Sequence, residues 1–269
     1  MMFRSLVSVS CLLLTMSVGS ICCADESHDL LEKTGSFTRK VTSTTVSGTG
    51  RSITTVNGVV VSSNSSGKQI IGSGVKGTRR VPFSGEIKSV TLEDDFNYHF
   101  DPSYGGNIIV TADDNVLEHL TVSATGGTLS VQAREFSIAK KTPVNVFWGG
   151  RPPSRVSITG AGSISLTDFN AEKLAARIVG SGTVVVAGQS QRVNVQISGS
   201  GTFDGDDLKI AELDLLVTGS GTVSAYVTES AEGSVLGTGS IKIKGKPKLR
   251  AIEIVGAASV RYADAVVKP

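Results

Sequence analysis

Gly199-Ser200-Gly201-Thr202 is one copy of a phrase, Gly-x-Gly-Ser/Thr, that lies between two apolar strand fragments and recurs along the chain. The other copies begin at Gly160, Gly180, Gly219 and Gly237, and a degenerate sixth copy begins at Gly256. From each first glycine to the next, the steps are 20, 19, 20, 18 and 19 residues. A period this regular, at this length, predicts similar units stacked into a solenoid.

Two columns of apolar residues accompany the phrase in all six repeats. Two positions before the first glycine stand Ile158, Ile178, Ile197, Val217, Val235 and Ile254. Four positions after it stand Ile164, Val184, Phe203, Val223, Ile241 and Val260. We expect both columns to point into one shared interior, where each buried side chain contributes roughly 1.5–3 kcal/mol before entropy is subtracted. Further inward candidates are Leu166, Leu174, Val186, Val193, Leu213 and Leu249.

The repeated glycines have a predicted backbone role. A chain that turns a corner in every coil needs a positive φ, or room where two coils approach closely, and glycine supplies either at low cost. The Ser or Thr after each pair is placed to stack on its counterparts as a hydroxyl ladder. The structural repeat glycines are Gly160, Gly162, Gly180, Gly182, Gly199, Gly201, Gly219, Gly221, Gly237, Gly239 and Gly256.

The repeat predicts an all-β fold, a single-stranded parallel β-helix with coils of about 19–20 residues. A propeller is disfavoured because a coil of this length is too short for a four-stranded blade. We expect the solenoid at residues 151–269 and a small β N-terminal part of the same head domain at 78–150. Residues 25–77 are rich in Ser, Thr, Gly and Val, which predicts a stalk, either flexible or made of loosely paired strands.

Residues 1–24 have the pattern of a signal peptide. A short positive segment with Arg4 precedes an apolar run, and Cys22-Cys23-Ala24 offers small residues before acidic Asp25. Cleavage is the favoured outcome, with a retained anchor or lipidation as alternatives. No later run approaches ~18 apolar residues, so we expect no transmembrane segment after cleavage. The predicted location is the periplasm, the cell surface or the extracellular space, and all three cysteines precede the cut.

No motif predicts a catalytic group, a metal site or a cofactor. The best candidate cluster is Glu93, Asp94, Asp95, His99 and Asp101, but alternation along a strand would place its members on both faces. We therefore interpret it as a solvated strand edge. Asp204-Gly205-Asp206-Asp207 resembles part of a calcium loop but lacks the later glutamate and does not recur from coil to coil, which favours a surface turn.

A basic segment and one aromatic residue are candidates for binding. If the segment is extended, its cations point outward in one row, which predicts either an anion-binding stripe or protection of the open end of the stack. The stripe consists of Lys242, Lys244, Lys246, Lys248 and Arg250. Trp148, the only tryptophan, has two interpretations: a platform for a sugar, or a cap over the first coil.

Two stretches resemble the head GIN domain family, a family of unknown function that is named for auto-transporter adhesins. One runs from Val90 to Val131 and includes Asp95-Phe96 and Gly126-Gly127-Thr128-Leu129; the other is the glycine ladder. The similarity covers roughly Arg79 to Lys268. It implies a right-handed single-stranded β-helix head and no established activity.

The functional hypothesis is an exported, secreted or periplasmic, non-enzymatic head domain that serves surface binding or adhesion. The alternatives are a polysaccharide-active β-helix enzyme and a purely structural envelope protein. The predicted partner is a glycan or another component of the cell envelope. We expect no nucleic-acid partner, because the formal net charge is only +2.

Overall fold

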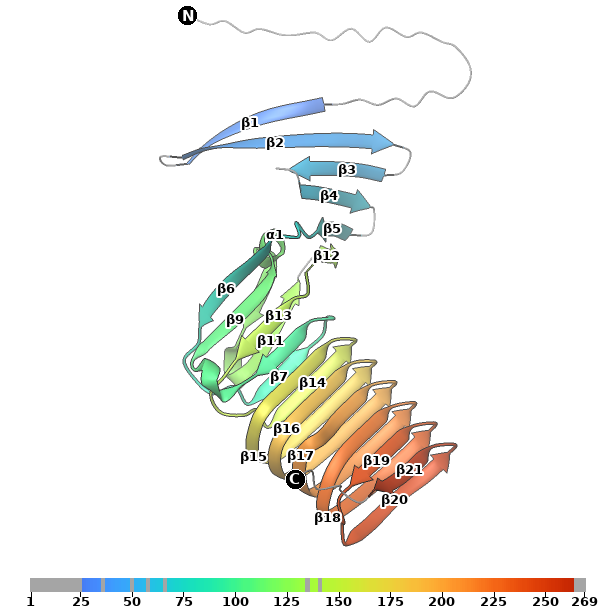
Figure 1. The fold of residues 1–269 in the computed structure, drawn as a ribbon. Helices are drawn as coiled ribbons and strands as arrows, with labels where there is room; N and C mark the ends of the chain where they lie inside the picture. The colour runs from blue at the N-terminus through green and yellow to red at the C-terminus, as the bar shows by residue number, and fades with distance from the viewer. Residues whose placement is uncertain are drawn as a thin grey trace, which may run out of the picture.

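The structure is a computed structural model that describes residues 26–34, 37–48, 51–56, 59–64, 67–133, 136–139 and 142–263. The predicted signal peptide at 1–24 lies outside these residues. Two sheets contain the strands of the molecule (Figure 1).

The first sheet is formed by the N-terminal strands. Their order is β1-β2-β3-β4-β5-β12, antiparallel up to β5, with β12 added parallel to β5. The segment predicted as a stalk or as loosely paired strands, residues 25–77, thus contains five paired strands. The six strands are β1 (Glu26–Thr34), β2 (Phe37–Gly48), β3 (Arg51–Val56), β4 (Val59–Asn64), β5 (Gly67–Ile71) and β12 (Phe136–Ala139).

A mixed β part leads into the solenoid. β7 pairs in parallel with the first repeat strand and β8 with the second, so these two strands act as a coil that begins the stack. The elements of this part are β6 (Lys76–Pro82), β7 (Ser89–Leu92), β8 (Asn97–Phe100), η1 (Pro102–Tyr104), β9 (Asn107–Asp113), α1 (Asp114–Leu117), β10 (Leu120–Ser123), η2 (Thr125–Gly127), β11 (Thr128–Ala133) and β13 (Asn145–Trp148).

The glycine repeats form a β-solenoid of about five turns, as the period predicts. Each coil pairs in parallel with the next, and the six first glycines lie in register from Gly160 to Gly256. Figure 1 shows β14 to β18 following one another in chain order, after which β19 and β20 both pair with β18, and β21 pairs with β19. These strands are β14 (Arg155–Gly160), β15 (Ser163–Gly180), β16 (Thr183–Gly199), β17 (Thr202–Gly219), β18 (Thr222–Gly237), β19 (Ser240–Lys244), β20 (Leu249–Gly256) and β21 (Ser259–Ala263).

The two predicted apolar columns form the solenoid core, except at its C-terminal end. The first five members of each column are buried, none more than 2% exposed. In the sixth repeat, Ile254 is 42% exposed, and Leu249 is 48% exposed. The prediction that these two side chains point into a covered interior is therefore wrong. They belong to the last coil, and no further coil of the described chain stacks on it.

The two glycines of each repeat are required for different reasons. Gly199 has a φ of 122°, and a Cβ there would lie 2.5 Å from the carbonyl oxygen of Gly180 in the preceding coil. Gly201 has no positive φ, but a Cβ there would lie 2.5 Å from Cγ2 of Ile178. The first glycine thus permits the backbone turn, whereas the second leaves room for a core side chain of the preceding coil.

Candidate functional site

The predicted acidic cluster is dispersed. Glu93 Oε2 accepts a hydrogen bond of 2.7 Å from Gln132. The ring of His99 stacks on Phe147 with a centroid distance of 4.9 Å. Asp101 Oδ1 accepts a hydrogen bond of 2.8 Å from the Ser103 backbone at the start of η1, and hydrogen bonds from Ser103 lower the pKa of Asp101. Within the described ranges, no three His, Cys, Asp or Glu side chains are grouped to hold a metal ion.

The acidic segment Asp204–Asp207, predicted as a surface turn, instead lies within β17, where the pairing with β18 shifts register between Gly205 and Lys209, and it meets the basic segment at Asp206. Its carboxylate accepts a hydrogen bond from Ser224 and lies 2.5 Å from Lys244 Nζ and 3.8 Å from Lys242 Nζ. Partial burial by itself would raise the pKa of Asp206, but the hydrogen bonds from Lys244 and Ser224 and the charges of both lysines outweigh it and lower the pKa. Asp206 therefore connects the third repeat to the fifth.

The predicted basic stripe does not stay extended. β19 ends at Lys244, and Gly245, with a φ of 89°, begins a turn that contains Lys246 and Lys248. Arg250 lies in β20, where its guanidinium is 4.7 Å from the ring centroid of Tyr262. The chain therefore distributes the five cations over a strand, a turn and a second strand. Anion binding by the exposed members remains a prediction.

Trp148 lies inside the molecule. It is 0% exposed, and its ring centroid is 6.0 Å from that of Tyr98 and 5.6 Å from that of Phe100. Through the strand registers, Trp148 aligns with Phe100 and then with Leu166 of the first repeat. A buried ring offers no face to a sugar, so the structure favours the second interpretation, an aromatic cap on the first coil.

A polar hollow of about 370 Å³ crosses several coils on one side of the solenoid. Asn170, Gln189 and Lys209 lie in register on successive coils, each exposed, and Gln189 Nε2 donates a hydrogen bond of 3.3 Å to Asn170 Oδ1. We call this surface the amide hollow. It is lined by Asn170, Ala171, Glu172, Gln189, Ser190, Gln191, Lys209, Ala211, Thr228 and Glu229.

A larger depression of about 700 Å³ lies on the adjoining sheet face. Its polar lining includes an Arg192–Glu212 ion pair and a hydrogen bond of 2.7 Å from Asn194 Nδ2 to Asp214 Oδ2. Its lining residues are Ser154, Arg155, Lys173, Leu174, Ala175, Arg192, Val193, Asn194, Glu212, Leu213, Asp214, Ser230 and Glu232.

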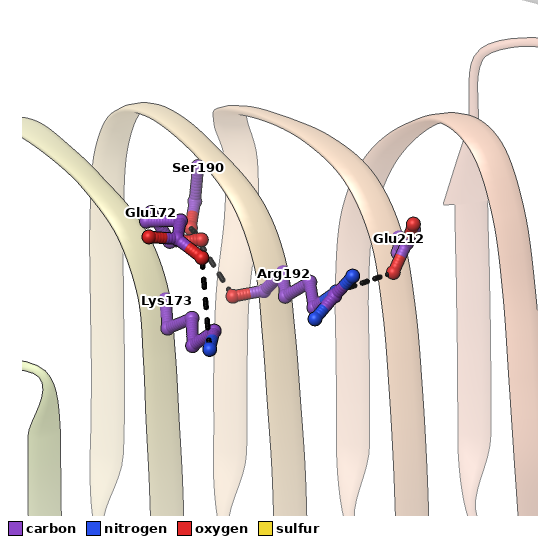
Figure 2. A network of polar contacts seen from close by, with 5 residues as sticks. All are labelled: Glu172, Lys173, Ser190, Arg192 and Glu212. Atoms are coloured by element: carbon purple, nitrogen blue, oxygen red, sulfur yellow. Dashed lines mark hydrogen bonds and ion pairs between the residues drawn. The ribbon is translucent and has the colours of Figure 1, made fainter.

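A network of polar contacts joins the two depressions (Figure 2). Lys173 Nζ lies 3.6 Å from Glu172 Oε1, and Ser190 Oγ donates a hydrogen bond of 3.2 Å to the Arg192 carbonyl. Arg192 Nε lies 2.7 Å from Glu212 Oε2 in the next coil, and this hydrogen bond raises the pKa of Arg192. Exposed pairs of this kind contribute little stability, so their main effect is to order side chains on the surface.

Neither surface was predicted from the sequence, although the repeat contains a signal for the first. Counting back ten positions from the first glycines of repeats two to four gives Asn170, Gln189 and Lys209. That column is polar, and in a solenoid such a column forms a continuous outer strip. The walls of both depressions, however, depend on corners whose shape the spacing does not predict.

Comparisons with known proteins agree with the fold. The family described as "Putative auto-transporter adhesin, head GIN domain" matches residues 151–247, which confirms the predicted resemblance over the solenoid. A "putative adhesin" of Bacteroides fragilis is 19% identical with a TM-score of 0.59, covering 72% of this chain and 100% of that one. A "putative lipid binding protein" of Parabacteroides distasonis is 19% identical with a TM-score of 0.48, covering 72% and 99%.

No curated protein matches the sequence. Among the residues that the structure describes, no helix has the length and apolar character needed to span a bilayer.

Proposed function

We propose that this chain is an exported, non-enzymatic head domain that binds a glycan of the cell envelope through the amide hollow. The observation that carries the proposal is the column of exposed Asn170, Gln189 and Lys209, one residue on each of three consecutive coils. The family match and the fold shared with the Bacteroides fragilis protein support an adhesin-like role. The signal-like N-terminal segment supports export.

The chemistry of the hollow suits a polyhydroxylated ligand. A side-chain amide both donates and accepts hydrogen bonds, as does a sugar hydroxyl, and Thr228 adds a hydroxyl to the lining. Neighbouring coils are about 4.8 Å apart, so the column offers polar groups at a regular spacing along an extended chain. Because the groups stand on paired strands, little ordering of the backbone is needed on binding.

One feature favours the enzymatic alternative, and the experiment must therefore measure turnover as well as binding. Glu172 and Glu229 both line the amide hollow, and paired carboxylates are the groups that glycoside hydrolases use. Glu172 already lies beside Lys173. A non-enzymatic head domain would bind a polysaccharide through this hollow and release no product.

The test is a glycan array probed with the purified protein, followed by product analysis on every polymer that binds. The double variant Asn170→Ala/Gln189→Ala removes two of the amides, and Gln196→Ala, an exposed amide on the sheet face, is the matched control. We expect selective binding that is lost in the double variant and kept in the control, without products. Product release would overturn the non-enzymatic role, and absent or unaffected binding would overturn the site.

The basic residues of the turn require a separate variant. Lys246→Gln/Lys248→Gln removes two exposed cations without touching the pairs that Lys242 and Lys244 form with Asp206. If the turn binds anionic polymers, this variant should lose that binding at low salt. Unchanged binding would leave the turn as protection of the open end of the stack.

A further inference from the structure

The sheet face beside the amide hollow has an ordered arrangement of outward side chains. Outward positions lie one, three, five and seven residues before each first glycine, because the residues between them are core positions. In register, these positions form four columns that cross the six repeats. We call the surface made by these columns on repeats one to six the charged face.

The charges on this face are separated by sign. Repeats one to three carry cations only, at Arg155, Lys173, Arg177 and Arg192. Repeats four to six carry anions only, at Glu212, Asp214, Glu232 and Glu253. All eight side chains belong to exposed residues. The boundary between the two halves is the Arg192–Glu212 pair of Figure 2.

The outer charges do not neutralise one another within the chain. Among the residues that the structure describes, Arg155 and Arg177 on one half, and Glu232 and Glu253 on the other, form no ion pair. Their neighbours in register carry no opposite charge: Arg155 aligns with Ala175, and Glu232 aligns with Asp214 on one side and Ala251 on the other. The two ends of the face therefore present opposite, uncompensated charge to a partner.

We propose that the charged face binds a second copy of this chain. A two-fold axis that runs along the strands, between the third and fourth repeats, places the two faces together. This operation reverses the order of the coils and keeps the position along each strand, so the first repeat lies opposite the partner's sixth and the second opposite its fifth. The contact is isologous, and every favourable pair occurs twice.

The charges match in this arrangement. Arg192 lies opposite the partner's Glu212, in the same column. Arg155 lies one column from the partner's Glu253, and Arg177 one column from the partner's Glu232. Columns on one face are separated by two residues, about 7 Å, which an arginine side chain can cross between sheets packed about 10 Å apart.

The column next to the glycines carries no charge. Val179 lies opposite the partner's Leu236, which is 41% exposed in the single chain. Thr159 lies opposite the partner's Val255, 54% exposed, and Ser198 opposite the partner's Thr218. Association thus covers apolar side chains beside the ion pairs. An unrelated partner would need its own complementary pattern, whereas a second copy already has one.

The area of the charged face sets the expected affinity of the dimer. Six coils about 4.8 Å apart and a strip of about six residues give roughly 500 Å² for each copy. That area lies at the lower end of specific interfaces, where complexes are weak and transient. We therefore expect a dimer with a dissociation constant in the micromolar range and a strong dependence on salt.

The test is sedimentation equilibrium of the purified full chain at low salt and near 1 M salt, where the Debye length is about 3 Å. We expect a monomer–dimer equilibrium at low salt, weakened at least about tenfold at high salt. The proposal would be overturned if the wild-type protein stays monomeric at low salt at protein concentrations up to about tenfold above the micromolar range.

Charge-reversal variants test the arrangement itself. Arg155→Glu/Arg177→Glu and Glu232→Arg/Glu253→Arg should each abolish the dimer, because like charges then face each other. An equimolar mixture of the two should form a heterodimer, because each outer pair again joins opposite charges, two pairs with the wild-type signs and two with the signs exchanged. Recovery in the mixture also shows that both variants are folded. A mixture that remains monomeric, or single variants that still dimerise, would overturn the two-fold arrangement.

A matched control removes the effect of net charge. Lys246→Glu/Lys248→Glu changes the charge by the same amount as Arg155→Glu/Arg177→Glu, but in the turn after β19. The control should dimerise like the wild type. Loss of the dimer in the control would mean that net charge, and not the charged face, governs association. Glycan binding at the amide hollow is measured separately, so either proposal can fail without the other.

Discussion

The third and sixth repeats have the same sequence pattern but bury it to different extents. Ile197 of the third repeat is 2% exposed, whereas Ile254, its counterpart in the sixth, is 42% exposed. The difference comes from the neighbours, because the third repeat has a coil on each side, whereas in the described part of the chain the sixth has a coil on one side. In a solenoid, a repeat contributes only part of its own core, and the next repeat completes it.

The third and fifth repeats differ at the second glycine of the phrase. A Cβ at Gly201 would lie 2.5 Å from a methyl of Ile178, whereas a Cβ at Gly239 would lie 3.3 Å from Val217. The requirement for glycine therefore depends on the core residue one coil earlier. In the sixth repeat the residue one coil earlier is Val235, and the position is Ala258. Alanine can thus replace the second glycine in the sixth repeat, because the core residue of the preceding coil is the smaller Val235.

The largest effect should follow the substitution Gly201→Val. Its Cβ would lie 2.5 Å from Cγ2 of Ile178. The backbone cannot easily move away, because the Thr202 N–H donates to the Gly182 carbonyl in one neighbouring coil and the Gly201 carbonyl accepts from the Thr222 N–H in the other. We expect a loss of about 3 kcal/mol or more in the free energy of unfolding, measured by denaturant titration. Ala258→Val is the control in the last coil and should cost clearly less. Equal costs would contradict the dependence on the preceding coil.

The second largest effect is expected at Ile197, and Ile254 is its counterpart in the last coil. Ile197→Ala removes a buried side chain between two coils and should lower the free energy of unfolding by about 2–4 kcal/mol. Ile254→Ala removes a side chain that already contacts water and should cost less than about 1 kcal/mol. Chemical denaturation of both variants measures the two losses in the free energy of unfolding and so checks their ratio. Similar losses would indicate that the last coil is covered in solution.

A smaller effect concerns the link from the third repeat to the fifth. The pKa of Asp206 is lowered in the folded chain, so its stabilising effect is present at neutral pH and is lost as the pH falls through the ordinary carboxyl value of 3.8 and below. Asp206→Asn should therefore lower stability by about 0.2–1 kcal/mol at pH 7.

The control for this link is Asp207→Asn, which changes the exposed neighbour of Asp206 in β17. Thermal unfolding measured across pH should show the difference between wild type and Asp206→Asn shrinking under acid conditions. A difference that is constant with pH would exclude ionisation of Asp206 as its cause.

The smallest effect should come from Ser200→Ala. Ser200 is exposed at the corner, and its backbone N–H, which donates to the Gly180 carbonyl over 2.9 Å, remains in the variant. We expect a change within about 0.5 kcal/mol in the same denaturation assay. A large loss here, or tolerance of Gly201→Val, would contradict the assignment of the phrase as a coil corner.

The candidate surfaces were less accessible to prediction than the core. The charges of the charged face stand in the sequence at intervals of about one coil, yet their separation by sign becomes visible only in register. The amide hollow depends in addition on the corners near Asp168 and Gly188, which have positive φ values of 49° and 134°. Neither corner recurs at a constant position, so the spacing of the repeat did not predict the hollow.

The repeat in the sequence is sufficient to predict the solenoid, its coil length, its two core columns and the corners at the glycines. These features are periodic, and a period expresses the same local requirement in every coil. The tertiary structure decided the exposure of Ile254, the turn at Gly245 and the burial of Trp148. Each of these depends on which side chains other coils bring alongside, and that depends on where the stack begins and ends.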